Sequence, residues 1–221
     1  MNFIELFNAG GPLMWPLAIA SLLTLALIVD RAINLRASRI LHPTVVERIT
    51  GLLEGGRVDR AIEVCREHPG LFPSIVLAGL ELVGKGEAAV KEAVENAGRH
   101  ESSRLHRYLG AMATIAAVTP LMGLLGTVLG MIDVFQTIAD QGAGQAASLS
   151  SGISQALITT ASGLVVAIPA LIAHNYFQEK ADFLVGELER ESLRMLRGLF
   201  GSERNSPSES PPAPSMAISG D

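Results

Sequence analysis

Charge is absent from three long stretches of this chain. Residues 6–29, 108–132 and 141–178 contain no Asp, Glu, Lys or Arg, and each is at least as long as the ~20 apolar residues that cross a bilayer as a helix. All 17 Lys and Arg residues lie instead in residues 31–107 and 180–204. Because Lys and Arg collect in cytoplasmic loops, the sequence predicts three transmembrane helices, with the N-terminus outside and the C-terminus inside.

Cysteine is represented by a single residue, Cys65. One cysteine excludes an internal disulfide and disfavours a metal site. Cys65 continues an apolar stripe at helical spacing that begins at Val58, so we predict a thiol packed in a helical core. The sequence also lacks a nucleophile–base set, a phosphate-binding loop and a cluster of metal ligands. These absences predict that the protein is not an enzyme and uses no cofactor.

A basic N-terminal region is missing as well, since Glu5 is the one charged residue in residues 1–11. A secretory signal peptide begins with positive charge, so the first apolar stretch is predicted to be a retained helix. The basic residues of the 31–107 segment alternate with acidic ones, which disfavours nucleic acid as a partner.

These observations predict an all-α integral membrane protein. After residue 201 the composition becomes rich in Ser and Pro without apolar periodicity, which predicts disorder. The predicted segments are an outer (periplasmic) N-terminus over residues 1–12, transmembrane helices over 13–30, 108–138 and 150–177, a cytoplasmic helical segment over 31–107, a short periplasmic loop over 139–149, a cytoplasmic helix over 178–200 and a disordered tail over 201–221.

The second and third spans are expected to continue beyond the membrane. From residue 87 the chain has no proline before Pro120 and no strong helix stop before about residue 138. One helix of that length would measure roughly 75–80 Å. The third span continues in the same way through residues 178–200, so the two helices would form a cytoplasmic helical stalk. The alternative is a break at each membrane surface, for which Gly98 and Gly110 are the expected sites in the first of the two helices.

Small residues line one face of the second span. Gly126 and Gly130 form a G-x-x-x-G pair, and Thr119 and Gly123 continue the same face. Such faces let helices approach closely in lipid, so Gly123, Gly126 and Gly130 are predicted to serve helix packing. Pro120 and Pro169 lie inside the second and third spans and are predicted to kink them.

The third span carries a polar stripe. Ser151, Gln155, Thr159 and Ser162 recur at helical spacing, with Thr160 beside them. A stripe of hydroxyl and amide groups is costly against lipid. The residues alone leave two interpretations open, which are contact with neighbouring helices and the lining of a polar pore.

Acidic and basic side chains are absent from the middle of every span. Proton relays in membranes usually run through such groups, so a titrating group for proton movement would come from another polypeptide. His174 lies beside Tyr176 and Phe177 near the end of the third span and is interpreted as an interfacial residue. The other four histidines, His106 among them, are interpreted as surface residues.

Two stretches resemble a known family. Residues 119–131, TPLMGLLGTVLGM, resemble the P-L-x-G-L-x-G-T-V-x-G signature of the MotA/TolQ/ExbB proton-channel family. Residues 152–170, GISQALITTASGLVVAIPA, resemble its G-I-x-x-A-L-x-x-T-x-x-G-L-x-x-A-I-P block. The three-span layout is similar to ExbB and TolQ rather than to four-span MotA, and we favour ExbB.

The resemblance implies a homopentamer in the bacterial inner membrane, around the single spans of an ExbD-like dimer that supplies an Asp to the proton path. The resulting motion would drive a TonB-like protein and so energise outer-membrane transport. Thr127 and Thr160 match the family's pore-facing threonines. A TolQ-like role in envelope integrity and cell division, with a TolR-like partner, and a passive oligomeric scaffold are the alternatives. Gln155 stands where many relatives carry Glu, and an amide cannot titrate.

Overall fold

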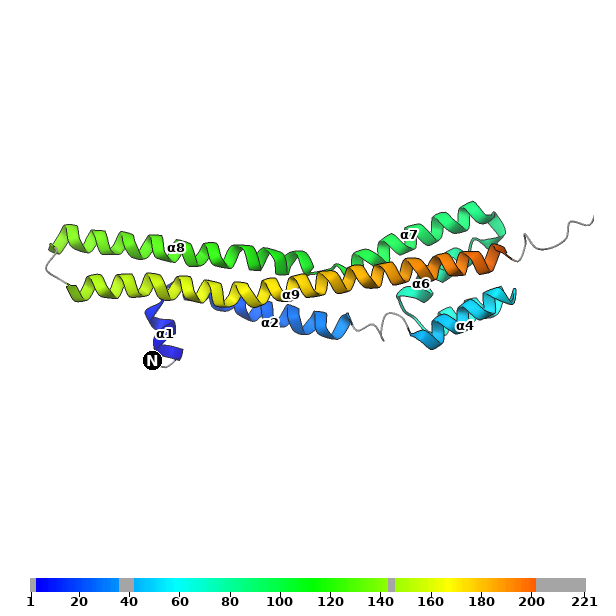
Figure 1. The fold of residues 1–221 in the computed structure, drawn as a ribbon, viewed down its shortest axis with the longest axis horizontal. Helices are drawn as coiled ribbons and strands as arrows, with labels where there is room; N and C mark the ends of the chain where they lie inside the picture. Colours follow the sequence, from blue (N-terminus) through cyan, green and yellow to red (C-terminus); the bar gives the residue numbers. More distant parts are fainter. Residues whose placement is uncertain (1–2, 36–41, 143–145, 202–221) are drawn as a thin grey trace, which may run out of the picture. The chain divides into compact units, whose positions relative to one another are not determined.

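The computed structural model describes residues 3–35, 42–142 and 146–201, and these residues are almost entirely helical (Figure 1). The predicted disordered tail lies, from residue 202 onward, outside the described residues. The helices are α1 (Phe3–Ala9), α2 (Met14–Asn34), α4 (Pro43–Glu54), α5 (Val58–Glu67), α6 (Leu71–Leu80), the 3₁₀ turn η1 (Val83–Lys85), α7 (Glu87–Leu105), α8 (Leu109–Gln141) and α9 (Ala146–Gly201).

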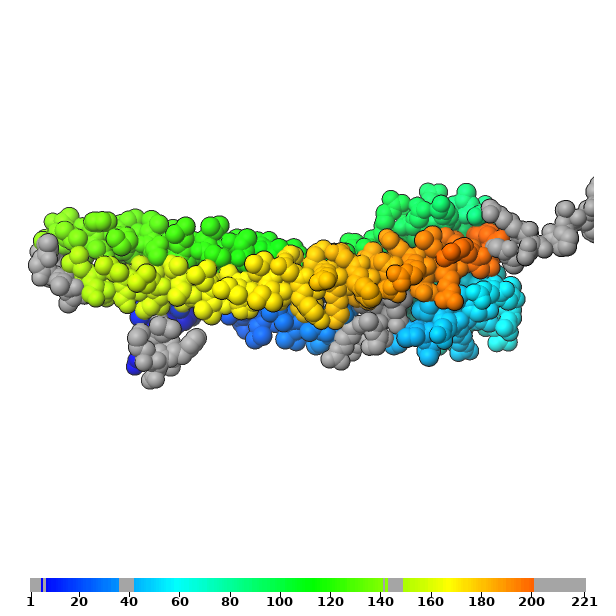
Figure 2. Space-filling model, viewed as in Figure 1, coloured from blue at the N-terminus to red at the C-terminus, as the bar shows by residue number. Residues whose placement is uncertain are grey.

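The chain divides into two compact units. The first comprises Met1–Ile40 and Arg99–Glu187, and so contains α2, α8 and most of α9. The second comprises Leu41–Gly98 and Leu188–Asp221. In the first unit, Figure 1 draws α8 and α9 antiparallel and side by side, and the space-filling view in Figure 2 shows their atoms in contact.

Among the described residues, three helices are long and apolar enough to cross a membrane, and they overlap the three predicted spans. Their large apolar side chains are mostly exposed in the single chain, Leu22 of α2 at 69% and Val165 of α9 at 70% among them. A soluble protein does not leave apolar surface of this extent in water. The prediction of an all-helical protein with three apolar membrane-length helices is therefore confirmed.

The expected continuous helix from residue 87 into the second span is interrupted. Helix α7 ends at Leu105 and α8 begins at Leu109, and between them Tyr108 adopts a left-handed backbone conformation with φ of 66°. This conformation ends an α-helix and costs a non-glycine residue free energy. The guanidinium groups of Arg31 and Arg107 lie 5.3 and 4.7 Å from the centre of the Tyr108 ring, where cation–π attraction offsets part of that cost.

The break does not lie at either expected glycine. Gly98 is inside α7 and Gly110 is inside α8. Glycine permits a break because it lacks a Cβ, but it does not require one. The position of the break is set instead by side chains that reach it from other helices.

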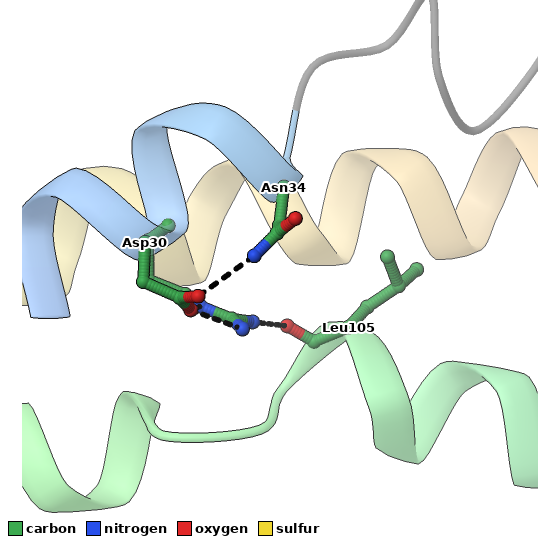
Figure 3. A network of polar contacts seen from close by, with 4 residues as sticks. Asp30, Asn34 and Leu105 are labelled. Atoms are coloured by element: carbon green, nitrogen blue, oxygen red, sulfur yellow. Dashed lines mark hydrogen bonds and ion pairs between the residues drawn. The ribbon is translucent and has the colours of Figure 1, made fainter.

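Arg31, near the end of α2, contacts the chain at this break, where Figure 3 shows Asp30, Asn34 and Leu105 close together. Its Nη1 donates a hydrogen bond of 3.3 Å to the carbonyl oxygen of Leu105, the last residue of α7. The final carbonyls of a helix have no partner within the helix, so Arg31 caps α7 from outside. Its Nε and Nη2 donate to Asp30 Oδ2 at 3.1 and 2.8 Å, and Asn34 donates to Asp30 Oδ1 at 2.8 Å.

Helix α2 continues past residue 30, the predicted end of the first span, to Asn34, and Arg31 is only 5% exposed. A buried guanidinium requires a charged or hydrogen-bonded partner, and Asp30 together with the Leu105 carbonyl meets that requirement.

A second polar contact ties the break to α9. His106, interpreted from the sequence as a surface residue, pairs with Asp182 through its Nε2 at 2.8 Å, and its Nδ1 lies 3.0 Å from the Ser102 carbonyl. Burial of the imidazole lowers its pKa, but the hydrogen bonds to Ser102 and Asp182 outweigh burial and leave the pKa of His106 raised. The same hydrogen bond has the opposite effect on its acceptor, since it lowers the pKa of Asp182. Both residues lie outside the charge-free stretches.

The second unit contains the short helices α4, α5 and α6, which lie within the predicted helical segment of residues 31–107. Helices α4, α5 and α6 bury apolar side chains that include Ile49, Leu53 and Phe72. Cys65 is buried among them at 3% exposure, which confirms the predicted core thiol. Burial raises the pKa of Cys65 to about 11.

Candidate functional site: the α8–α9 pair and its two polar edges

The face of α8 that carries Gly123, Gly126 and Gly130 lies directly against α9. A Cβ atom placed on Gly126 would lie 2.5 Å from Thr159 Cγ2, and one on Gly130 would lie 2.9 Å from Ala156 Cβ. A Cβ on Gly123 would meet the Thr160 backbone at 3.0 Å. These distances are shorter than van der Waals contact between carbon atoms, so the helix separation requires glycine at these positions.

Helix α9 contributes glycines to the same contact. A Cβ on Gly163 would lie 2.7 Å from the Thr119 carbonyl oxygen, and one on Gly152 would lie 2.6 Å from Val134 Cγ2. The packing role of these two glycines was not predicted from the sequence. Their spacing indicates it, because Gly152 and Gly163 are 11 residues apart, which is close to three helical turns. The five glycines together form the close helix contact, which we call the glycine seam.

Thr160 and Thr127 lie on one edge of the glycine seam. The Thr160 hydroxyl donates to the Gly123 carbonyl oxygen at 2.8 Å, which joins α9 to α8. Thr127 follows Gly123 by four residues, so it lies on the same side of α8 one turn later. Its hydroxyl donates to the Leu124 carbonyl oxygen at 2.6 Å. Both side chains are half-buried in the single chain, so part of each faces away from the helix pair.

Thr159 and Gln155 face a different neighbour. The Thr159 hydroxyl lies 2.9 Å from the Gly10 carbonyl oxygen and 2.8 Å from the Gln155 carbonyl oxygen. Gly11, at φ of +72°, contacts the Gln155 side-chain amide. The turn before α2 therefore covers this edge of α9. Helical periodicity cannot identify such a neighbour, since Gly10 and Thr159 are 149 positions apart.

The predicted polar stripe is thus divided between two edges. Thr159 is only 1% exposed in the single chain, where Gly10 covers its hydroxyl, and its place in a pore lining remains a prediction. Ser151 is exposed, and Ser162 and Gln155 are half-buried. Thr160 and Thr127 are separated from this group by the glycine seam. Pro120 and Pro169 lie inside helices that continue through them, and their predicted kinks remain predictions.

Among the described residues, no group of three His, Cys, Asp or Glu side chains is placed to hold a metal ion. Along the glycine seam, over residues 119–130 and 151–163, the polar groups are hydroxyls, one amide and backbone carbonyls. Such groups donate and accept hydrogen bonds without changing charge.

These features define a multi-pass membrane protein built on a tightly packed helix pair, with uncharged polar groups along two edges. The chain belongs to the MotA/TolQ/ExbB proton channel family, whose profile matches residues 69–190. That match includes all of the glycine seam, Thr127 and Thr160.

Individual relatives support the same assignment. Biopolymer transport protein ExbB-like 3 of Synechocystis sp. is 35% identical over 178 residues, which are 77% of this chain and 82% of the relative. Biopolymer transport protein exbB1 of Vibrio cholerae is 26% identical over 183 residues, covering 81% of this chain and 80% of the relative. The Tol-Pal system protein TolQ of Pseudomonas aeruginosa is 36% identical over 121 residues, covering 55% of this chain and 48% of the relative.

Proposed function

We propose that this chain is the channel subunit of an ExbB-type complex in the bacterial inner membrane. With an ExbD-like single-span partner it would convert the proton gradient into mechanical work that energises TonB-dependent outer-membrane transport. The observation that carries this proposal is the edge formed by Thr127 and Thr160. In the proposed assembly this edge would present hydroxyl groups to a neighbour, from helices that contain no acidic or basic side chain along residues 109–132 and 150–173.

The partner's role follows from what these spans cannot do. Hydroxyl groups can relay hydrogen bonds and support water, but they do not release protons near neutral pH. A carboxylic acid on the partner span would supply the exchanging proton, and Thr127 and Thr160 would face it. Gln155 cannot replace that acid, because an amide does not titrate, and its side chain is occupied against Gly11.

Assembly follows from the exposed surface. The outer faces of α8 carry exposed Leu121, Leu124, Val128 and Phe135, and in a membrane such faces contact lipid or further copies of the chain. A homopentamer that surrounds the partner spans would place the Thr127–Thr160 edge of each copy inward. The N-terminus would then be periplasmic, because the basic residues follow the first span.

Replacing Thr160 tests the proposal. Thr160→Val removes the hydroxyl while it keeps the branched shape, and Thr160→Ser keeps the hydroxyl. Proton flux would be measured in liposomes that contain the chain together with its single-span partner. We expect Thr160→Val to lower flux at least tenfold, as is typical when a proton-handling group is lost, and Thr160→Ser to retain most of it.

The matched control is Thr114→Val on α8, whose hydroxyl bonds only to its own helix at Gly110. The interhelical hydrogen bond of Thr160 contributes about 0.5–1.5 kcal/mol to stability, so assembly should survive in every variant. Equal flux in Thr160→Val and Thr114→Val would contradict a channel role and favour a passive oligomeric scaffold.

A TolQ-like role is the second candidate, and the 36% identity to a TolQ protein favours it. Deletion of the gene separates the two roles. Loss of uptake of iron chelates supports the ExbB-type function, whereas detergent sensitivity and chained cells with intact uptake support a TolQ-type function with a TolR-like partner.

A further inference from the structure

The break between α7 and α8, residues 105–109, is contacted by side chains from two other helices, and we call it the joint. Leu105 accepts a hydrogen bond from Arg31 of α2, and the next residue, His106, bonds to Asp182 of α9. An arginine side chain stays charged at every pH at which proteins work, so the contact from α2 is permanent. A histidine side chain changes its charge near neutral pH. Of these two contacts, the one with α9 therefore depends on pH.

Both ring nitrogens of His106 face hydrogen-bond acceptors. Nδ1 lies 3.0 Å from the Ser102 carbonyl oxygen, and Nε2 lies 2.8 Å from Asp182 Oδ1. A carbonyl oxygen and an ionised carboxylate accept hydrogen bonds but cannot donate them, and a neutral imidazole carries one N–H group. Both contacts are satisfied together when the ring is an imidazolium, which donates from each nitrogen. The arrangement therefore selects the charged form of His106.

Loss of one proton leaves one of these contacts without a hydrogen atom. If the N–H group stays on Nε2, the Nδ1 lone pair faces the Ser102 carbonyl oxygen. If it stays on Nδ1, the Nε2 lone pair faces the Asp182 carboxylate. Two acceptors at hydrogen-bond distance repel each other, and the charge-assisted bond to the carboxylate is lost in either tautomer. The neutral ring therefore does not fit this position, and we expect it to turn away.

Solvent reaches the pair directly. The side chain of His106 is 33% exposed and that of Asp182 is 59% exposed, whereas the side chain of Arg31 is 6% exposed. Both members of the pair also lie outside the three charge-free stretches. Protons can therefore exchange between His106 and water without a path through the packed helices.

The counter-charge in hydrogen-bond contact with the His106 ring is that of Asp182. The other charged groups of the elements around the joint are Asp30 and Arg31 of α2, Glu101, Arg104 and Arg107 on the α7 side, and Glu179, Lys180 and Glu187 of α9. Two of these cations, Arg31 and Arg104, pair with neighbouring carboxylates. Helix α8 carries no charge over residues 109–132, so it adds none at the joint.

We propose that His106 and Asp182 form a proton-operated clasp on the joint. With the imidazolium bound to Asp182, the last turn of α7 is fixed to α9. With the neutral imidazole this attachment is released, while Arg31 keeps its hydrogen bond to Leu105. The step exchanges one proton with water, so no other reactant is consumed.

The pH range of the clasp follows from the two titrations. The pKa of His106 is raised above its ordinary value of 6.5, and the pKa of Asp182 is lowered below its ordinary value of 3.8. The clasp is therefore closed between pH 3.8 and pH 6.5, and it opens as pH rises through the raised pKa of His106. Under the proposed function His106 would lie on the side that receives protons, so delivered protons would close the clasp. That consequence rests on the proposed function, whereas the clasp does not.

Two spin labels test the clasp in the full chain, without a partner protein. Ser103→Cys on α7 and Gly186→Cys on α9 place the labels about one turn from His106 and from Asp182. Both sites are exposed, and a Cβ on Gly186 meets nothing within 4 Å. The native thiol, Cys65, is 3% exposed and should stay unlabelled. We expect a narrow distribution of label-to-label distances at pH 6 and a longer, broader one at pH 9.

Three variants connect this change to the pair. His106→Gln should remove the pH dependence of the distance, because an amide does not titrate. Asp182→Asn keeps the shape of the side chain without its charge, so it should move the titration of the His106 ring, followed by NMR, to lower pH. His100→Gln, at an exposed position of the same helix α7, is the matched control and should change neither measurement.

Three results would overturn the clasp. They are a His106 ring that titrates at or below pH 6.5 in the unsubstituted chain, equal distance distributions at pH 6 and pH 9, and a distance change that persists in His106→Gln. The first of these needs no substitution, so it decides the matter even if a variant fails to fold. Because the measurements use neither a partner nor proton flux, they leave the proposed function to its own test with Thr160→Val.

Discussion

Replacing Gly126 with Ala should force α8 and α9 apart. The new Cβ would lie 2.5 Å from Thr159 Cγ2 and 2.7 Å from Thr159 Cβ, whereas carbon atoms in contact prefer roughly 3.5–4.0 Å. Rotation of the Thr159 side chain cannot remove the second contact, because Cβ moves only with the backbone. It would also disturb the hydroxyl contact with the Gly10 carbonyl. Relief therefore requires about 1 Å of helix displacement.

The cost of that displacement can be bounded. Overpacking a well-packed core costs typically 1–3 kcal/mol, and Ala gains up to about 1 kcal/mol over Gly in helix propensity. After the full propensity gain, the net loss of stability for Gly126→Ala is up to about 2 kcal/mol. Gly110→Ala in the same helix is the matched control, because a Cβ there has nothing within 4 Å. It should be neutral or more stable by up to about 1 kcal/mol.

Thermal unfolding of the two variants in the same detergent measures the difference. Gly126→Ala should melt below the unsubstituted protein, and Gly110→Ala should melt at or above it. If Gly126→Ala melts as high as Gly110→Ala, the glycine seam is not the contact described here and the argument from helix separation is refuted.

Three further predictions concern groups outside the seam. Arg31→Met should lower the stability by about 2 kcal/mol, since it removes the charged donor to the Leu105 carbonyl. Arg31→Lys should lower the stability less. Melting temperatures in detergent compare the two variants. The His106–Asp182 pair should stabilise the fold fully between pH 3.8 and pH 6.5. This contribution is lost as pH rises through the raised pKa of His106, and it is also lost as pH falls from 3.8 through the lowered pKa of Asp182. Melting from pH 5 to 9 should show the loss at high pH, and His106→Gln should remove that pH dependence. The Cys65 thiol, with its pKa of about 11, should be about one part in a thousand ionised at pH 8 and react with iodoacetamide only after unfolding.

Each of these has a clear contrary result. Arg31→Met with wild-type melting would mean that Asp30 and Leu105 need no cation. Identical pH curves for the wild type and His106→Gln would remove the ion pair from the stability of the fold. Labelling of folded protein at the rate of a free thiol would place Cys65 outside the core.

The spans and the glycine face were accessible from the sequence because they depend on local pattern. An absence of charge over 24 or more residues has few explanations other than a membrane. The spacing of Gly123, Gly126 and Gly130 follows one helix face whatever that face contacts. Cys65 was predicted correctly for the same reason, since its stripe is a property of one helix.

The break at Tyr108 and the division of the polar stripe were not accessible, because both depend on residues far away in the sequence. Leu105 is 74 positions from the guanidinium that caps it. Local rules pointed to Gly98 and Gly110, which α7 and α8 accommodate. Thr159 likewise belonged to the predicted polar stripe, and only the packing of Gly10 reveals that it is covered.

The most direct test of the channel proposal is proton flux in liposomes that contain this chain alone, with the proposed ExbD-like partner, or with that partner after the proposed intramembrane Asp is replaced by Asn. Flux should occur only with the unsubstituted partner, because the edge formed by Thr127 and Thr160 has hydroxyls but no acid. Flux through the chain alone, or undiminished flux with the Asn partner, would contradict the proposal that another polypeptide supplies the titrating group.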